Sequence, residues 1–176
     1  MKNTNISTSR AFTLIEAMVA VTILTLSIAG PLYSASRAII AAQSARDQLI
    51  ASHLAQEGIE YVRAMRDDAY LSAYPGGTSA AWDNFKALIS SCGTSCQFDP
   101  AISSLTACSG SSCIPLYLAP THIYTQQTGG TVTPFTRIIR VSATSAIDEM
   151  IESTVSWNFH GIPFSVTIID HLTSWQ

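Results

Sequence analysis

An apolar run near the N-terminus constrains this chain more than any other feature of its sequence. Between residues 12 and 32, Glu16 is the single charged side chain. A helix rises about 1.5 Å per residue, so this run would span about 30 Å, the thickness of a bilayer's hydrocarbon core. The residues before the run include Lys2 and Arg10 and no acid. Because basic residues stay on the cytoplasmic side, we expect residues 1–11 in the cytoplasm and the remainder exported.

Two simpler interpretations explain the run less well. The apolar part of a secretory signal peptide has about 7–15 residues and ends at a small-residue cleavage site, whereas this run is longer. A plain signal anchor would explain the length but not Glu16, since a charge at the centre of a spanning helix costs at least about 2.5 kcal/mol. We therefore expect Glu16 to have a function and a partner.

The residues around Glu16 form a motif. Residues 10–16, RAFTLIE, with the apolar run behind them, resemble the processing site of type IV prepilins and type II secretion pseudopilins. In that family a small residue, usually Gly, precedes the cut, a Phe usually follows it, and a Glu lies four residues after the Phe. The resemblance implies cleavage between Ala11 and Phe12 and N-methylation of the new Phe12 amine. Ala11 stands in place of the usual Gly, so we expect slower cleavage.

The resemblance also implies a role for Glu16. Cleavage leaves a positive amine on Phe12, one helical turn before Glu16, and a buried carboxylate is tolerated only when it is paired. The implied partner is the Phe12 amine of an adjacent subunit. Such a pair would set the axial register of a subunit that enters a filament.

The helical pattern continues beyond the apolar run, over residues 33–69. Good helix formers dominate there, and the apolar positions recur every three or four residues, as on one face of an amphipathic helix. We expect this face to pack on a C-terminal sheet; its members are Ile50, Leu54, Tyr61, Val62 and Met65. We expect a solvated or inter-subunit face to carry Arg46, Asp47, Glu57, Glu60, Arg63 and Arg66.

Gly30 and Pro31 lie where the predicted membrane span ends. Proline lacks an amide hydrogen and clashes with the preceding turn, so we expect a kink or local melting of the helix. Pilins commonly carry a proline in this region, and the resemblance implies that the helix loosens there within a filament.

Four cysteines lie within residues 92–113, a segment rich in Ser, Gly and Thr that we expect to be an irregular loop. In an exported chain they predict disulfides rather than zinc. Four cysteines allow three pairings. We favour a nested pattern, Cys96–Cys108 inside Cys92–Cys113, because facing residues of an antiparallel hairpin have a constant sum of numbers and longer loops constrain the unfolded chain more. Two local bridges, Cys92–Cys96 and Cys108–Cys113, are the alternative.

Residues 70–176 are predicted to form a globular domain. Residues 82–89 suit a short helix, and the last forty residues alternate apolar and polar side chains as half-buried strands do. The alternating segments are residues 135–141, 155–159 and 164–168, with a turn at 160–163 that predicts an antiparallel hairpin. Residues 114–118 and 122–125 are further strand candidates.

These patterns together predict an α+β, pilin-like fold, in which a long N-terminal helix packs on a small C-terminal antiparallel sheet. We expect a cleaved leader before a helix with a transmembrane half and an amphipathic half, followed by the globular domain with its Cys-rich loop. The boundaries we expect are 1–11 for the leader, 12–32 and 33–69 for the two helix halves, 70–176 for the domain and about 114–173 for its sheet.

The sequence carries no catalytic or metal-binding pattern that we can identify. His53, His122, His160 and His171 are scattered, and HExxH, GxSxG and P-loop motifs are absent. A net charge of −3 offers no basic bias toward nucleic acid. We therefore expect no enzymatic activity, no cofactor, no metal and no nucleic-acid partner.

Two functional hypotheses remain. The first is a structural subunit, a minor pilin of a type IV pilus or a pseudopilin. Its expected partners are prepilin peptidase, other pilin or pseudopilin subunits, an inner-membrane assembly platform and membrane lipid. It would cross the inner membrane once, with a cytoplasmic leader and an exported C-terminal domain, before joining a cell-surface pilus or a periplasmic pseudopilus. The second is an anchored surface binding module for DNA, adhesion or a secreted substrate.

Overall fold

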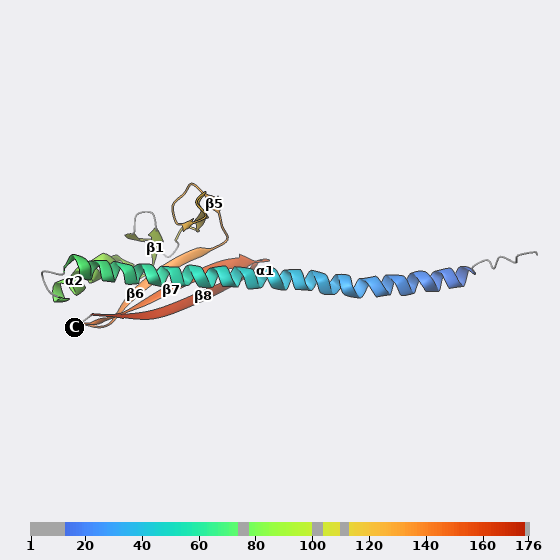
Figure 1. Ribbon diagram of the computed structural model, residues 1–176, viewed down its shortest axis with the longest axis horizontal. Helices are drawn as coiled ribbons and strands as arrows, with labels where there is room; N and C mark the ends of the chain where they lie inside the picture. Colours follow the sequence, from blue (N-terminus) through green and yellow to red (C-terminus); the bar gives the residue numbers. More distant parts are fainter. Residues whose placement is uncertain (1–12, 74–77, 100–103, 110–112, 175–176) are drawn as a thin grey trace, which may run out of the picture. The chain divides into compact units, whose positions relative to one another are not determined.

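The computed structural model describes residues 13–73, 78–99, 104–109 and 113–174 and has an α+β fold (Figure 1). A long helix, α1 (Leu14–Ser72), is followed by α2 (Thr78–Ile89) and a 3-10 turn, η1 (Ser90–Cys92). Antiparallel strands complete the chain. The contacts divide it into two units, Met1–Ala45 and Arg46–Gln176, so α1 contributes to both.

The larger sheet has the strand order β2-β1-β6-β7-β8, and every neighbouring pair is antiparallel. Its strands are β1 (Cys96–Asp99), β2 (Ser104–Ala107), β6 (Thr136–Ser145), β7 (Asp148–Phe159) and β8 (Ile162–Thr173). The predicted hairpin is confirmed: Phe159 pairs with Ile162 across a two-residue turn. Both turn residues, His160 and Gly161, have positive φ, which matches the twist of the flanking strands.

A second sheet has the order β4-β3-β5, from β3 (Tyr117–Leu118), β4 (Tyr124–Thr125) and β5 (Thr131–Val132). The expectation of one sheet within residues 114–173 was therefore wrong in two respects. These short strands form a sheet of their own, and the Cys-rich segment, expected to be irregular, supplies β1 and β2 to the larger sheet. Cys96 and Phe98 explain the second difference, because both side chains are buried in the core and hold β1 against β6.

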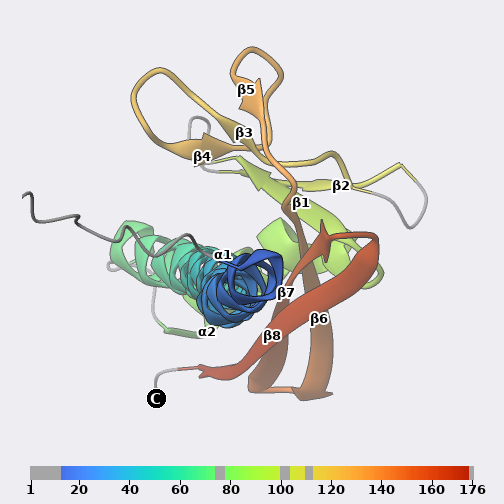
Figure 2. The same ribbon diagram turned by 90° about the vertical axis from the view of Figure 1, so that its right-hand side faces the viewer.

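The C-terminal part of α1 lies against one face of the larger sheet (Figure 2). The predicted face is confirmed at Leu54 and Val62, which are buried, while Ile50, Tyr61 and Met65 are partly buried at its margin. The centre of the contact consists largely of small residues that the apolar periodicity did not single out: Ala51, Ala55, Gly58 and Ala69. Small side chains allow the helix to approach the strands closely. At Gly58 an added Cβ would lie 2.5 Å from Ser153 Oγ.

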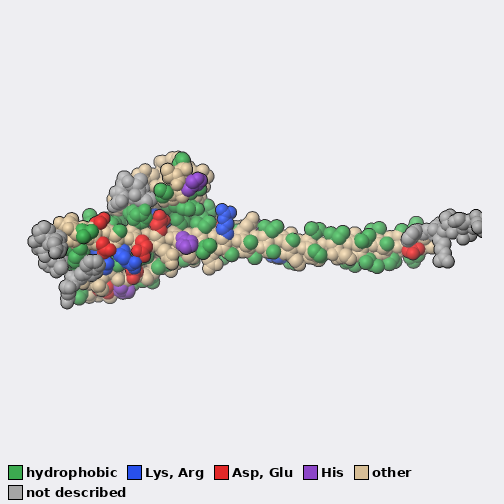
Figure 3. Space-filling view, viewed as in Figure 1, with side chains coloured by type: hydrophobic (Ala, Val, Ile, Leu, Met, Phe, Trp, Pro, Cys, Tyr) green, Lys and Arg blue, Asp and Glu red, His purple; other side chains and the backbone are tan. Residues whose placement is uncertain are grey.

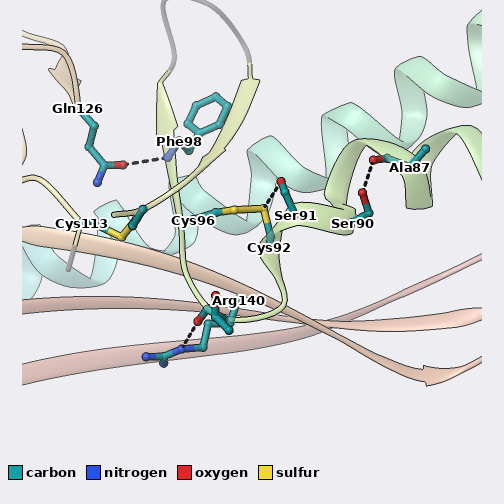
Figure 4. The surroundings of a disulfide bond; sticks show 11 residues. Ala87, Ser90, Ser91, Cys92, Cys96, Phe98, Cys113, Gln126 and Arg140 are labelled. Carbon is teal, nitrogen blue, oxygen red and sulfur yellow. Dashed lines mark hydrogen bonds between the residues drawn. A yellow bond between two sulfur atoms is a disulfide. The ribbon is translucent and has the colours of Figure 1, made fainter. Parts of the chain in front are cut away.

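The disulfides correct the favoured prediction. Cys92 is bonded to Cys96, as Figure 4 shows, and Cys108 to Cys113, so the nested pairs Cys96–Cys108 and Cys92–Cys113 do not form. A hairpin does exist here, but Cys96 pairs with Ala107 rather than with Cys108. Successive side chains of a strand point to opposite faces, so this one-residue shift turns Cys108 away from Cys96. Each cysteine instead meets its neighbour in sequence, with Cα–Cα distances of 5.1 and 4.9 Å.

Candidate functional site

The N-terminus of α1 is capped by its own sequence. Thr13 Oγ1 accepts a hydrogen bond from the Glu16 backbone N–H at 3.3 Å, and the Thr13 carbonyl accepts from Ala17 N–H at 3.2 Å. Thr13 and Glu16 have the spacing of a capping box, in which a Thr and a Glu three residues later satisfy the first free amides of a helix. A carboxylate in the first turn also interacts favourably with the helix dipole. This spacing predicts a local role for Glu16 in starting the helix, besides any role toward a second subunit.

The segment behind Glu16 exposes large apolar side chains along its whole length. Leu14, Met18 and Leu26 are each more than three-fifths exposed, and α1 is long and apolar enough to cross a membrane. The hydroxyls in this segment donate to carbonyls of the preceding turn: Thr22 to Val19, Thr25 to Thr22 and Ser27 to Ile23, at 2.7–2.9 Å. Hydroxyls paired in this way need no water, so they are compatible with a hydrocarbon environment.

Gly30 and Pro31 lie inside α1, which continues through them without a break. An added Cβ at Gly30 would meet nothing within 4 Å, so the glycine is not required by a neighbouring side chain. Local melting at this point is thus not observed in the isolated chain. Loosening within a filament stays a prediction.

A comparison with known protein families found a match in this same segment. The model of the prokaryotic N-terminal methylation motif matches residues 6–30. The chain carries a type IV pilin-like leader. No curated protein and no solved structure matches the chain significantly. The long helix packed on antiparallel sheets is consistent with a pilin-like fold.

The pilin-like leader implies processing by prepilin peptidase and assembly with other pilins in general. Together with the apolar helix it indicates membrane anchoring. The cleavage residues Ala11 and Phe12 lie outside the described residues, so the cut between them and the methylation of Phe12 stay predictions. Glu16 is described and exposed, and its pairing with a neighbouring Phe12 amine also stays a prediction.

Sequence reasoning missed a buried polar centre between the pilin-like helix and its sheet. Arg137 of β6 is fully buried, and its Nη1 donates to Glu57 Oε2 at 2.8 Å and to the Leu54 carbonyl at 3.2 Å. Its guanidinium lies 5.7 Å from the ring centroid of Phe98. Burial lowers the pKa of Arg137, while the neighbouring Glu57 opposes that shift. The alternation of side chains along the strand could have predicted this burial, because Arg137 lies between the inward-facing Phe135 and Ile139 and shares their face.

The prediction that the charged residues of α1 lie on a solvated or inter-subunit face was wrong for two of them. Glu57 is half-buried against Arg137, and Arg66 is buried, with its Nη2 bonded to Asp67 Oδ1 at 2.9 Å. Glu60 and Arg63, by contrast, are substantially exposed and pair with each other at 2.8 Å. Arg63 also reaches Asp170 of β8 at 2.8 Å.

The histidines lie apart in the described structure. His53, His122 and His160 are exposed, and His171 contacts Asp148 with 3.0 Å between Nδ1 and Oδ2. Within residues 13–73, 78–99, 104–109 and 113–174, no three side chains of His, Cys, Asp or Glu converge as metal ligands would.

Proposed function

We propose that this chain is a structural subunit, a minor pilin or pseudopilin, of a filament rooted in the inner membrane. One observation carries the proposal: a methylation motif stands at the head of an apolar run, residues 12–32, whose single carboxylate, Glu16, lies in the first turn of α1. In this function the leader is removed at Ala11/Phe12 and the helices of many subunits bundle. The exposed apolar side chains of residues 14–32 support it, since they need lipid first and other helices afterward.

In this proposal, the pairing of Glu16 with the Phe12 amine of an adjacent subunit sets the axial register of each subunit in the filament. A carboxylate among packed apolar helices is stable only beside a positive charge. The motor, platform and peptidase that act on such filaments are further parts of the proposal, as is an exported C-terminal unit.

Processing is tested by mass spectrometry of the assembled protein. The mature chain should begin at methylated Phe12 and contain 165 residues, which is 176 minus the 11 of the leader. Restoring the usual glycine with Ala11→Gly should speed the cut. A chain that begins at Met1, or one cut after Gly30, would contradict the proposal.

The role of Glu16 is tested with two variants, because the spacing of Thr13 and Glu16 is also that of a capping box. Glu16→Gln keeps a side chain that suits the box but removes the charge, whereas Glu16→Ala removes both. Charge pairing predicts that both variants insert into the membrane and fold but fail to enter filaments. Glu60→Ala, which removes an exposed carboxylate of the same helix, should assemble like the parent. Normal assembly of Glu16→Gln would reject the pairing.

A second candidate function, an anchored surface binding module, is favoured by a specific observation. Val132 of β5 and Ile123, which directly precedes β4, are both exposed, and neither is part of the larger sheet or of α1. An exposed apolar surface outside the assembly helix is a feature that distinguishes a binder from a purely structural subunit. Filament subunit and binder are compatible functions in one chain.

A further inference from the structure

The small sheet and its loops, residues 113–136, form what we call the small-sheet lobe. Charged residues make up 12% of the chain, yet no Asp, Glu, Lys or Arg occurs from residue 100 to residue 136. The lobe lies at the top of Figure 3, where the face in view shows apolar and neutral polar atoms and a histidine, but no red or blue atoms. Its surface therefore offers no carboxylate, ammonium or guanidinium group for an ionic ligand to pair with.

The strand register shows which side chains share the outer face of the lobe. Tyr117 is directly opposite Thr125 on one side and Val132 on the other. Leu116 is fully buried, and Tyr117, which by alternation lies on the opposite face, is partly exposed. Val132 is 61% exposed, and the Tyr117 hydroxyl makes no hydrogen bond within the described part of the chain. The face thus presents an aromatic ring between a hydroxyl-bearing and an aliphatic side chain.

The lobe is firmly attached to the larger sheet by Gln126, whose side chain is buried. Its Oε1 accepts from Phe98 N–H at 2.9 Å, and its Nε2 donates to the carbonyls of Arg137 and Ile114 at 3.0 and 3.2 Å (Figure 4 shows the bond to Phe98). Bonds from one side chain to three segments hold the outer face in one geometry. A surface ordered in advance loses less entropy when it binds a ligand.

The tip of the lobe is hollowed as well. A pocket of about 330 Å³ lies between the loop after β3 and the loop before β5, lined by Pro120, His122, Gly129 and Thr131 among others. The loop before β5 lies directly against β3 at Gly130. A Cβ at this position would collide with the Leu118 carbonyl, so only glycine fits there. The pocket walls supply apolar carbons, a hydroxyl, an imidazole and main-chain polar groups, with no Asp, Glu, Lys or Arg among the lining residues.

This chemistry selects among ligands. Nucleic acids and acidic polymers are bound by Lys and Arg, and basic peptides by carboxylates, and the lobe has none of these side chains. A sugar ring, in contrast, has an apolar C–H face that stacks on an aromatic ring and a rim of hydroxyls that exchange hydrogen bonds with hydroxyls and main-chain groups. We propose that the small-sheet lobe binds a neutral polysaccharide, with Tyr117 stacking against a sugar ring and Val132 and Thr125 flanking it.

The inference goes beyond the proposed filament function and does not depend on it. The lobe contains none of the residues assigned to processing or register. Variants of the lobe should therefore still assemble, and a failure of binding would leave the filament proposal untouched.

The test uses the purified full-length chain in detergent micelles and two sets of immobilised polymers. Dextran, a β-glucan and chitin oligomers are the neutral probes; heparin, alginate and DNA are the charged ones. We expect binding to at least one neutral probe, unchanged between low and high salt, because no ion pair is involved. Val132→Glu and Tyr117→Ala should each weaken it about tenfold or more.

A matched control separates the lobe from a general effect of added charge. Ile169 is an aliphatic β-branched residue of β8, 55% exposed, and Ile169→Glu makes the same change outside the lobe. It should bind like the parent, and circular dichroism should show that all variants are folded. Three results would overturn the proposal: no neutral probe binds, only charged polymers bind and do so less at high salt, or Val132→Glu and Ile169→Glu bind equally well.

Discussion

Gly58 and Ser153 show how closely the helix and the sheet of this protein approach each other. Ser153 is fully buried on β7, and its hydroxyl has no hydrogen-bond partner among the described residues. A Cβ at position 58 would lie 2.5 Å from that hydroxyl and 3.3 Å from Arg137 Cδ. Glycine weakens a helix by about 1 kcal/mol relative to alanine, so its presence inside α1 has to be explained by this contact.

We predict that Gly58→Ala destabilises the protein despite the gain in helix propensity. Overpacking a core costs about 1–3 kcal/mol, which exceeds the propensity gain of about 1 kcal/mol. Urea denaturation of the folded unit should therefore show a lower midpoint. Ser153→Ala in the same chain removes the clashing oxygen and should recover part of the loss, whereas additive effects of the two substitutions would contradict the contact.

Glu149 predicts a specific dependence of stability on pH. Burial raises the pKa of its carboxyl above the ordinary 4.5, Lys86 opposes the shift and Asp148 adds to it. The folded chain therefore holds this proton more tightly than the unfolded chain does. Stability contributed by the protonated form is fully present below pH 4.5 and is lost as pH rises through the folded pKa.

Glu149→Gln removes this carboxyl, so the variant should be more stable than the parent at neutral pH and no more stable below pH 4.5. Denaturation midpoints across that range measure the difference. Glu60→Gln is the control, because the side chain of Glu60 is 62% exposed. A constant gap between Glu149→Gln and the parent at all pH values would show that ionisation of Glu149 is not its cause.

At the scale of elements, two disulfide bonds flank the β1–β2 hairpin. The Cys92–Cys96 bond ties η1 to β1, with both residues fully buried in the core between α2 and the sheet. The Cys108–Cys113 bond closes the segment between β2 and the small-sheet lobe. Arg140 of β6 donates to the Thr94 carbonyl at 2.9 Å and fixes the turn between the first pair of cysteines. The bridges thus stabilise turns beside the hairpin rather than linking its strands.

Local pairing predicts a simple result in peptide mapping. Asp99 lies between the two cysteine pairs, so an Asp-specific protease that cuts before it should separate them without reduction. Each released peptide should carry one internal disulfide. A single product that joins the two peptides until it is reduced would indicate the nested pattern instead.

The two bridges should also differ in their contributions to stability. Their sequence separations, 4 and 5 residues, are nearly equal, so the constraint on the unfolded chain is similar. Replacing Cys92 and Cys96 by Ala should cost about 2–4 kcal/mol, and replacing Cys108 and Cys113 should cost less, because Cys108 is only partly buried. Unfolding of both variants by urea measures the difference, and equal losses would show that burial plays no part.

At the scale of the whole molecule, membrane contact and folding use different parts of α1. The buried residues of this helix begin at Ala51, and those described before Gln43 are all exposed. Residues from Arg46 onward form a compact unit with its own core. The same helix can therefore pass through lipid at one end while its other end completes a globular core.

We predict that a chain starting at Arg46 is soluble and keeps the fold of the parent. Near-ultraviolet circular dichroism should match that of the full chain, and the melting temperature should lie within about 4 °C of it, the shift expected for 1 kcal/mol in a domain of this size. A chain starting at Ile59 is the contrasting variant. It lacks Ala51, Leu54 and Ala55, which pack with Trp157, and should not fold. Failure of the longer truncation to fold would show that the first unit supports the core.

Much of this protein was determined by its sequence alone. The methylation motif and the apolar run can be predicted because both are linear segments of sequence, recognisable without any tertiary contact. The long helix and the β7–β8 hairpin follow from periodicity and a two-residue turn, which are local as well.

Only the tertiary structure decided which faces meet. Shifting a strand by one residue exchanges its two faces, so the pairing of Cys96 with Ala107 selected the local disulfides over the nested ones. The alternation of faces also places Arg137 in the interior, where it pairs with Glu57 of α1, eighty positions earlier in the sequence. Register and burial depend on contacts between distant segments, and those contacts exist only once the chain has folded.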